Sequence, residues 1–317
     1  MVRVYFATDV HGSDLVWRKW LSVPAVHKAD ILILAGDLTG KAICPIVKQS
    51  DGSHISNVFG RNWKMNNETE LNEMKERVAR VGYYPFVCDQ REYMDYQQNP
   101  KKIDKLMLDL ISQRIANWLD LLVGHVDVKE KKAIVMPGND DEKVIDPIIK
   151  SYEDRGIIYP LEKTVNLCYD FEMISLDYAN PTPWNTPREC SEQELKKKID
   201  DLFQKVKDYR KTICNFHCPP FGTQLDLARK LDKNLKPVLM LGNPVFIHVG
   251  SKSVEEAIRK YQPMMGLHGH IHESFASDKI GNTIVVNPGS EYTEALLRGF
   301  IIEFSERGVD KYWKVEG

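Results

Sequence analysis

Seven side chains that can bind a metal ion occur in five short fragments, far apart in the sequence. They are Asp9, His11, Asp37, Asn139, His217, His270 and His272. Each fragment comes just after a short apolar run that predicts a buried strand. A rigid sheet positions the loops at its strand ends, and such loops often carry reactive groups. The pattern therefore predicts a two-metal hydrolytic site assembled from distant strand ends.

The individual ligands fit this chemistry, although each one alone is compatible with an ordinary turn. Asp9 and His11 are two residues apart at a strand end, so both side chains can point to one side and chelate one metal. Asp37 has two carboxylate oxygens and can bridge two cations. Asn139 offers a neutral amide oxygen, which is unusual in structural zinc sites but suits a second catalytic metal. Their joint occurrence favours a single site.

Histidines supply the remaining ligands. His217 ends a predicted strand and precedes a proline-rich turn. His268, His270 and His272 are spaced two residues apart, which places all three on one face of an extended segment. Three crowded imidazoles would repel one another if protonated, so a metal that keeps them neutral is the natural partner.

The apolar patterns predict strands that alternate with helices, which is typical of an α/β protein. Strands are expected at 2–7, 31–35, 133–136, 171–176, 212–216 and 264–267, and helices at 14–21, 103–122, 142–152, 192–209 and 254–261. Ser191, with Glu194 three residues later, and Ser251 are expected to cap two of the helices. Segments 283–287, 299–304 and 309–315 are expected to form a C-terminal strand meander.

The length of 317 residues indicates a single domain over residues 1–317. Residues 40–102 break the alternation of strands and helices and are interpreted as an insertion within that domain. We expect the insertion to contain a hairpin at 43–48 and 54–59, around an Asp51-Gly52 turn, followed by a helix at 68–81.

The composition of the chain disfavours some classes of binding partner and some cellular locations. The formal net charge of -2 and a pI near 6.5 disfavour long nucleic acid bound mainly through its phosphates. The 6 cysteines contain no CxxC pair, which favours free thiols in a reducing compartment. The sequence shows no signal-peptide pattern and no apolar stretch of membrane-spanning length. We therefore expect a cytoplasmic protein without a membrane partner; a homo-oligomer is left open.

Together the five fragments resemble the signature of the calcineurin-like metallophosphoesterases, DxH, GD, GN(H/D)(D/E), H and GHxH, from Asp9 to His272. A later turn at residues 287–290 is similar to one in small prokaryotic members. The resemblance implies a four-layer α/β/β/α sandwich with two mixed β-sheets. It also implies one metal held by Asp9, His11, Asp37 and His272, and another held by Asp37, Asn139, His217 and His270.

The mechanism implied by the resemblance is in-line attack on phosphorus by a hydroxide shared between two divalent cations. Mn²⁺ is the preferred metal, and Fe, Zn²⁺ or Ni²⁺ also fit these ligands. The expected activity is hydrolysis of a small phosphodiester or phosphomonoester. A catalytically idle metal-binding scaffold or interaction protein on the same fold is the first alternative, and a nuclease is the second.

Residue 140 departs from many family members, in which a histidine there protonates the leaving oxygen. Here it is Asp140, a carboxyl that two nearby cations would keep ionised and that is therefore a poor general acid near neutral pH. His268 is a hypothetical replacement acid. With Asp37 and Asn139, these two residues complete the candidate catalytic set. The departure favours a phosphodiesterase over a phosphomonoesterase.

A loop with three prolines, residues 178–188, follows the strand that ends near residue 176 and is a candidate for binding the small phosphorylated substrate. Trp184 offers a flat face for a ring, and Arg188 offers a fork for phosphate. The alternative is that Trp184 only packs within the loop and that Arg188 is solvated.

Overall fold

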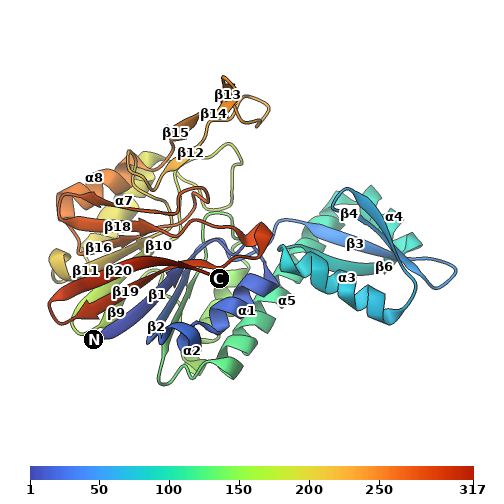
Figure 1. Ribbon diagram of the computed structural model, residues 1–317, viewed down its shortest axis with the longest axis horizontal. Helices are drawn as coiled ribbons and strands as arrows, with labels where there is room; N and C mark the ends of the chain where they lie inside the picture. Colours follow the sequence, from blue (N-terminus) through green and yellow to red (C-terminus); the bar gives the residue numbers. More distant parts are fainter.

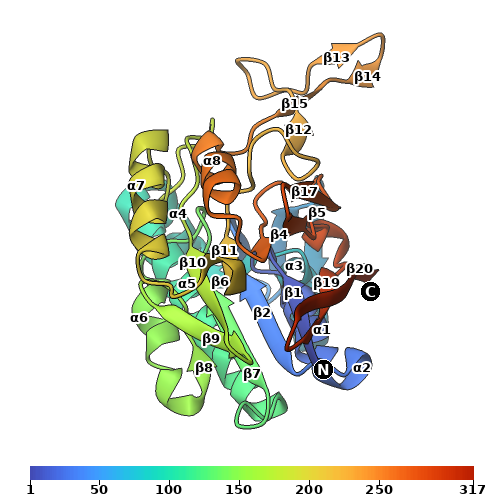
Figure 2. The ribbon, with the colours of Figure 1, turned by 90° about the vertical axis from the view of Figure 1, so that its left-hand side faces the viewer.

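Two six-stranded mixed sheets form the body of the protein in the computed structural model, which describes residues 1–317 (Figures 1 and 2). The first sheet has the order β20-β19-β1-β2-β7-β8. Its strands are β20 (Gly308–Glu316), β19 (Arg298–Ser305), β1 (Val2–Ala7), β2 (Ile31–Ala35), β7 (Lys132–Met136) and β8 (Ile157–Ile158). The four strands from β1 to β8 are parallel, whereas β19 and β20 add an antiparallel edge.

The second sheet repeats this plan, with a parallel centre and antiparallel edges. Its order is β17-β18-β16-β11-β10-β9. The strands are β17 (Ala276–Ile280), β18 (Thr283–Asn287), β16 (Met265–Leu267), β11 (Thr212–Phe216), β10 (Phe171–Leu176) and β9 (Thr164–Cys168). Strands β18, β16, β11 and β10 run parallel to one another. The carboxyl ends of each parallel set therefore lie at one edge of its sheet.

Helices cover the outer faces of these sheets. Those beside the first sheet are α1 (Asp14–Leu21), α2 (Val23–His27), α5 (Pro100–His125) and α6 (Ile145–Lys150), while α7 (Glu192–Phe203) and α8 (Lys252–Tyr261) lie beside the second. The largest core cluster has 48 buried residues from the first sheet, its helices and the inner face of the second sheet. A second cluster of 14 residues joins α7 and α8 to the second sheet.

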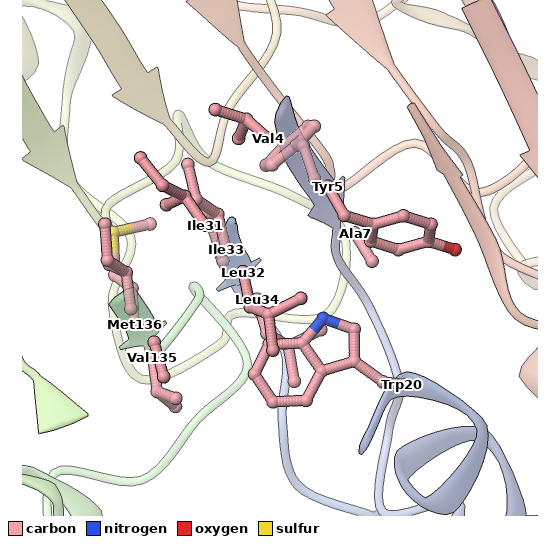
Figure 3. Close-up of a cluster of buried hydrophobic side chains, with 14 of the residues drawn as sticks. Val4, Tyr5, Ala7, Trp20, Ile31, Leu32, Ile33, Leu34, Val135 and Met136 are labelled. Atoms are coloured by element: carbon pink, nitrogen blue, oxygen red, sulfur yellow. The ribbon is translucent and has the colours of Figure 1, made fainter. Parts of the chain in front are cut away.

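Strand β2 shows why the central strands are apolar without alternation. All five of its residues are buried, because one face of the sheet meets helices and the other meets the second sheet. Figure 3 shows part of this cluster, with side chains of β1, β2 and β7 and with Trp20 of α1. The same burial explains why this strand could be predicted with its observed bounds.

Residues 43–98 form a separate unit with its own four-stranded sheet of order β5-β4-β3-β6, here called the four-stranded unit (Figure 1). It contains β3 (Ile43–Lys48), β4 (His54–Val58), β5 (Arg61–Met65), α3 (Glu68–Arg80), β6 (Tyr84–Asp89) and α4 (Gln90–Gln98). The expected hairpin and helix are present. Strands β5 and β6 and helix α4 add to them. A cluster of 7 buried residues lies between α3 and the strands β3, β4 and β5.

A thin β-ribbon, residues 227–248, projects from the second sheet and is called the arm (Figures 1 and 2). Strands β12 (Leu227–Arg229) and β15 (Phe246–His248) pair at its base, and β13 (Leu239–Met240) and β14 (Asn243–Pro244) pair near its tip. Apolar runs at 238–241 and 245–247, around Gly242-Asn243, are the sequence signal for the hairpin at its tip, which was not predicted. None of the helices combines the length and the apolar character needed to cross a membrane.

The predicted C-terminal meander is wrong. Strand β18 pairs with β16 and β17 in the second sheet, whereas β19 and β20 belong to the first. The chain crosses between sheets after β18, and strand patterns along the sequence do not reveal such a crossing. Helices α6 and α7 are also shorter than predicted, and the α7 pattern ends in a 3-10 turn at Tyr209–Lys211. Both expected N-caps, Ser191 and Ser251, are confirmed.

Leu32 in β2 tests the contribution of this core. Its side chain is fully buried, so we expect Leu32→Ala to leave a cavity and to lower the free energy of unfolding by about 2–5 kcal/mol. Urea unfolding followed by circular dichroism measures this change. Val26→Ala, at a position 69% exposed, is the control and should cost less than about 0.5 kcal/mol. Equal losses in the two variants would contradict the described core.

Candidate metal centre

The predicted ligands lie in loops that follow parallel strands of both sheets. Asp9 and His11 follow β1, Asp37 follows β2, and Asn139 follows β7 in the first sheet. His217 follows β11, and His270 and His272 follow β16 in the second sheet. The carboxyl ends of parallel strands are the usual place for ligands in open α/β sheets. Here the strand ends of two sheets meet around one site.

These loops bring six of the seven predicted ligands into two groups that share one residue. The ligand atoms of Asp9, His11, Asp37 and His272 lie within 4.8 Å of one another, as do those of Asp37, His217 and His270. Asp37 divides its oxygens between the groups: Oδ2 lies 3.6 Å from His11 Nε2, and Oδ1 lies 3.4 Å from His217 Nε2. Each group can hold one metal ion, with Asp37 between them.

The seventh predicted ligand, Asn139, faces the same pocket. Its Nδ2 donates a hydrogen bond to Thr186 Oγ1 at 2.8 Å, which orients the amide. Its Oδ1 is buried and has no hydrogen-bond partner, and the same holds for His11 Nδ1 and both ring nitrogens of His217. Buried polar atoms are rarely left unpaired, and a metal ion would account for Asn139 Oδ1 and for His217 Nε2, which lies toward Asp37. The donor set of carboxylates, imidazoles and one amide fits hard or borderline divalent cations.

The backbone at the site is held in conformations that residues with side chains rarely adopt. Asp9, His11, Asp37 and His270 have φ values of 55°, 40°, 45° and 70°. Positive φ values of this kind concentrate at functional sites, where the surrounding structure maintains them. Hydrogen bonds do so here: Asp9 N donates to Gly36 O at 3.0 Å and His11 N to Asp37 O at 2.9 Å.

Glycines allow the loops to approach closely. A Cβ atom on Gly36 would lie 1.9 Å from His217 Nδ1, and one on Gly138 would lie 2.3 Å from Asp37 Oδ1. Both positions must therefore be glycine for the ligands of the two sheets to meet. Gly36 also has a φ of 106°, which adds a conformational reason.

Asp141 holds two of the metal-binding loops together through hydrogen bonds, and it was not among the predicted site residues. Its buried carboxylate accepts hydrogen bonds from the backbone N–H groups of Leu38, Thr39 and Gly138. It thereby ties the loop after β2 to the loop after β7. Burial and the nearby charge of Asp37 raise the pKa of Asp141 to about 6. Its position beside Asn139 and Asp140 was the only signal in the sequence.

At the centre of the site, the Asp37 carboxylate and the His217 imidazolium each favour the charged form of the other. Burial opposes the charge on Asp37, but the imidazoles of His217 and His11 outweigh this and hold its pKa well below the ordinary value. Burial also opposes the charge on His217, but the carboxylates of Asp37 and Asp9 outweigh it and raise the His217 pKa to about 9. Burial lowers the pKa of His270 to about 4. In the metal-free protein, His217 therefore carries the proton that a metal must displace.

A cavity of about 570 Å³ opens onto these ligands. Its walls come from the metal-binding loops, the proline-rich loop and the arm, and they include Lys41, Asp140, Trp184, Arg229 and Ile247. Trp184 is 60% exposed and borders the cavity, as a substrate-contacting ring would.

Lys41 was not predicted, and it pairs with Asp140 at the edge of this cavity. Burial and the charge of Asp37 raise the pKa of Asp140 in the metal-free protein, while Lys41 opposes this shift. Two bound cations would shift this pKa in the opposite direction, because nearby positive charge favours the ionised carboxyl. The position of Lys41, just after Gly40 at the end of the loop that carries Asp37, was the available signal.

Arg188 does not face the cavity, so its predicted role in binding phosphate is wrong. The side chain is buried and pairs with Asp177 at 2.7 Å and Asp146 at 2.8 Å. Its remaining N–H groups donate to the carbonyl oxygens of Asp141 and Glu142. All donors of the guanidinium are thus occupied. Arg188 instead joins the proline-rich loop to the loop that carries Asn139.

His268 is likewise turned away from the cavity, which argues against its role as a replacement acid. Strand β16 ends at Leu267 and His270 has a positive φ, so the segment is not extended and the three histidines do not share one face. His268 is fully buried, and its Nδ1 lies 2.8 Å from Phe216 O and 3.0 Å from Cys218 O. Burial lowers its pKa to about 4.

Comparisons with known proteins identify the fold but not the activity. No protein-family model matches the sequence. The uncharacterized protein MJ1162 of Methanocaldococcus jannaschii is 33% identical over 159 residues, a match that covers 50% of this chain and 63% of that protein. The match thus spans less than two thirds of that relative.

Two solved structures share the fold over nearly their whole length. One crystal structure has a TM-score of 0.56 at 17% identity and covers 99% of this chain and 98% of its own. The protein TT1561 of Thermus thermophilus has a TM-score of 0.52 at 13% identity, with the same coverage of 99% and 98%. At these identities the likeness concerns the α/β fold alone.

Gly36→Ala tests the close approach of the two sheets. The added methyl group would displace His217, so we expect Mn²⁺ binding to weaken by about tenfold or more, as seen when groups that orient a ligand are lost. Equilibrium dialysis measures the metal bound per chain. Gly52→Ala is the matched control, because Gly52 also has a positive φ (83°) but has no atom within 4 Å of the added carbon. Equal binding by the two variants would show that Gly36 does not position His217.

The pKa of His217 predicts how metal affinity depends on pH. His217 is protonated at neutral pH in the metal-free protein and must lose this proton to bind a metal. We expect the apparent affinity for Mn²⁺ to rise by up to about tenfold per pH unit until about pH 9 and then to level off. Calorimetric titration in buffers of different protonation enthalpy measures both the affinity and the released proton. A flat profile with no proton release would contradict this assignment.

Proposed function

We propose that this chain is a metal-dependent hydrolase of phosphoric esters from the calcineurin-like metallophosphoesterase superfamily, of the small prokaryotic type. The observation that carries the proposal is the division of the two Asp37 oxygens between two groups of ligands. A carboxylate buried between two sets of imidazoles is the arrangement that a bridged pair of cations requires. The four-layer α/β/β/α sandwich is part of this proposal, supported by two six-stranded sheets with helices beside each.

The residues that would hold the metals follow from the geometry of the site. Asp9, His11, Asp37 and His272 would hold one divalent cation; Asp37, Asn139, His217 and His270 would hold the other. Bound there, two cations would lower the pKa of a water molecule and neutralise charge on the phosphoryl oxygens. We keep Mn²⁺ as the proposed metal and the cytoplasm as the proposed location.

The residues around the metal ligands support a diester as substrate. The carboxyl of Asp140 faces the cavity, and when ionised it would repel a doubly charged phosphomonoester more than a singly charged diester. Lys41, paired with this carboxyl, can turn its ammonium group towards a phosphoryl oxygen or the leaving oxygen. Trp184 would pack against the organic part of the substrate.

Neither predicted proton donor is placed to act efficiently, since His268 is buried away from the cavity and Asp140 is paired with Lys41. We therefore propose that leaving groups that depart without full protonation are hydrolysed fastest. The idle scaffold is the alternative, and its mark would be the loss of metal ligands. All seven predicted ligands are present at this cavity or directly beneath it.

Hydrolysis of bis(p-nitrophenyl) phosphate tests the function. We expect Mn²⁺-dependent turnover that chelation abolishes and added Mn²⁺ restores, and a lower rate with the corresponding monoester because of its extra charge. Release of p-nitrophenolate is followed by absorbance. His217→Ala should lose at least about 100-fold in kcat/KM, whereas Gly52→Ala should retain the rate. Two bound metals per chain without hydrolysis of any ester tested would favour the scaffold.

A further inference from the structure

The arm exposes a concentration of apolar side chains that the fold does not use. Leu239, Met240 and Leu241 at its tip are 59%, 68% and 97% exposed, and Phe246 behind them is 49% exposed. The arm stands away from both large sheets and pairs only with itself (Figures 1 and 2). Scattered exposed apolar residues are ordinary, but a contiguous apolar tip marks a surface that meets another apolar phase.

The turn at the tip of the arm contains a leucine where its backbone conformation disfavours one. Met240 and Asn243 are paired, so the connection consists of Leu241 and Gly242, with φ values of 52° and 84°. A two-residue hairpin loop with positive φ at both positions strongly prefers Asn, Asp or Gly, since a side chain such as leucine is strained there. Leucine at position 241 therefore strains the turn. Its side chain is 97% exposed, so it makes almost no packing contact that would offset this strain.

The base of the arm is rigid, in contrast to its bare tip. The buried carboxylate of Asp226 accepts hydrogen bonds from the backbone N–H groups of Thr223 and Gly250 at 3.0 Å each, and from His248 Nδ1 at 2.7 Å. The direction in which the tip points is thus set by the body of the protein. This favours a role in docking over that of a loose loop.

The rest of the arm carries positive charge, at its base and in a separate loop closed by the Leu231–Pro237 bridge. Residues 227–248 contain four basic residues, Arg229, Lys230, Lys233 and Lys236, and one acidic residue, Asp232, which gives a net formal charge of +3. All four basic side chains are exposed. The carboxylate of Asp232 is occupied by hydrogen bonds from the backbone N–H groups of Asn234 and Lys236. Since the whole chain carries -2, the remaining residues carry -5.

We propose that the arm docks onto the surface of an anionic lipid bilayer. Leu239, Met240 and Leu241 insert at the boundary between headgroups and acyl chains, and the basic residues behind them contact lipid phosphates. A bilayer needs no complementary shape, so a narrow tip is sufficient. The acidic remainder of the chain is repelled by the same surface, which leaves the arm as the part that approaches it.

Other occupants fit these observations less well. A second copy docked arm to arm would bring together two arms of net formal charge +3 each, and the narrow tip offers little of the roughly 1,200–2,000 Å² that a stable interface buries. Nucleic acid would use the basic residues but gain nothing from Leu239, Met240 and Leu241, because bases stack on aromatic side chains.

The proposal goes beyond the hydrolytic function and differs from the expectation of no membrane partner. That expectation rested on the absence of a long apolar segment, whereas here the fold gathers a few apolar residues at one projection. Because Arg229 and Ile247 of the arm also line the cavity above the metal ligands, docking would hold the mouth of the cavity near the lipid surface.

Sedimentation with vesicles tests the proposal on the full chain. We expect binding to vesicles of phosphatidylcholine mixed with phosphatidylglycerol, weaker binding to phosphatidylcholine alone, and weakening at high salt. The double variant Leu239→Ser, Leu241→Asn should bind at least about tenfold more weakly. Lys233→Glu with Lys236→Glu should lose the preference for anionic vesicles.

Matched controls separate docking from folding and from hydrolysis. Leu241→Asn alone suits the positive φ, so its melting temperature should not fall while its vesicle binding does. Ile55→Ser with Met94→Ser removes two exposed apolar residues from the four-stranded unit and should leave vesicle binding unchanged. The tip variants should hydrolyse a small soluble diester at the unaltered rate, because the tip does not line the cavity.

Three outcomes would overturn the proposal. The first is no sedimentation with anionic vesicles, or equal sedimentation of the tip variants. The second is a concentration-dependent dimer in analytical ultracentrifugation that the tip variants abolish, which would assign the arm to a second copy. The third is tighter binding of a single-stranded oligonucleotide that depends on Lys233 and Lys236 but not on the tip. None of these outcomes would alter the test of hydrolysis.

Discussion

The buried carboxylate of Asp37 is the group on which the rest of the site depends. Its two oxygens face His11 on one side and His217 on the other, so it joins ligands from both sheets. A charge buried this deeply is stable only with partners of opposite charge. Protonated His217 provides one in the metal-free protein, and bound cations would replace that proton.

The arrangement of the two sheets brings the loops that carry metal ligands together around Asp37. Each sheet has parallel strands at its centre, and the loops that follow these strands carry the ligands. Gly36 and Gly138 remove the side chains that would keep the loops apart, while Asp141 ties two of the loops together through backbone N–H groups. Positive φ values at Asp9 and Asp37 are the local strain that this convergence maintains.

The cavity above the metal ligands has one wall formed by the proline-rich loop and another formed by the arm. Arg188 joins the proline-rich loop to the loop after β7 by hydrogen bonds to the carbonyl oxygens of Asp141 and Glu142, and to α6 by its ion pair with Asp146, so that wall is fixed from within the protein. The opposite wall belongs to the arm, whose base is held by Asp226 but whose tip lies free of both large sheets. The cavity therefore combines a fixed floor of candidate metal ligands with a wall that belongs to the projecting arm.

The sequence by itself determined the central strands, most helices and the gathering of the metal ligands at one site, because burial on both faces leaves uninterrupted apolar runs and the ligands directly follow them. Their division into two groups was implied by the family resemblance. Tertiary structure alone decided where side chains outside these runs point. Arg188 and His268 point inward because buried carboxylates and carbonyl oxygens accept their hydrogen bonds, and Lys41 reaches the cavity from beyond the motif in the loop that carries Asp37. Strand β18 joined the second sheet because its pairing partners β16 and β17 lie there, and residues 227–248 formed the arm by local pairing of β12 with β15 and of β13 with β14.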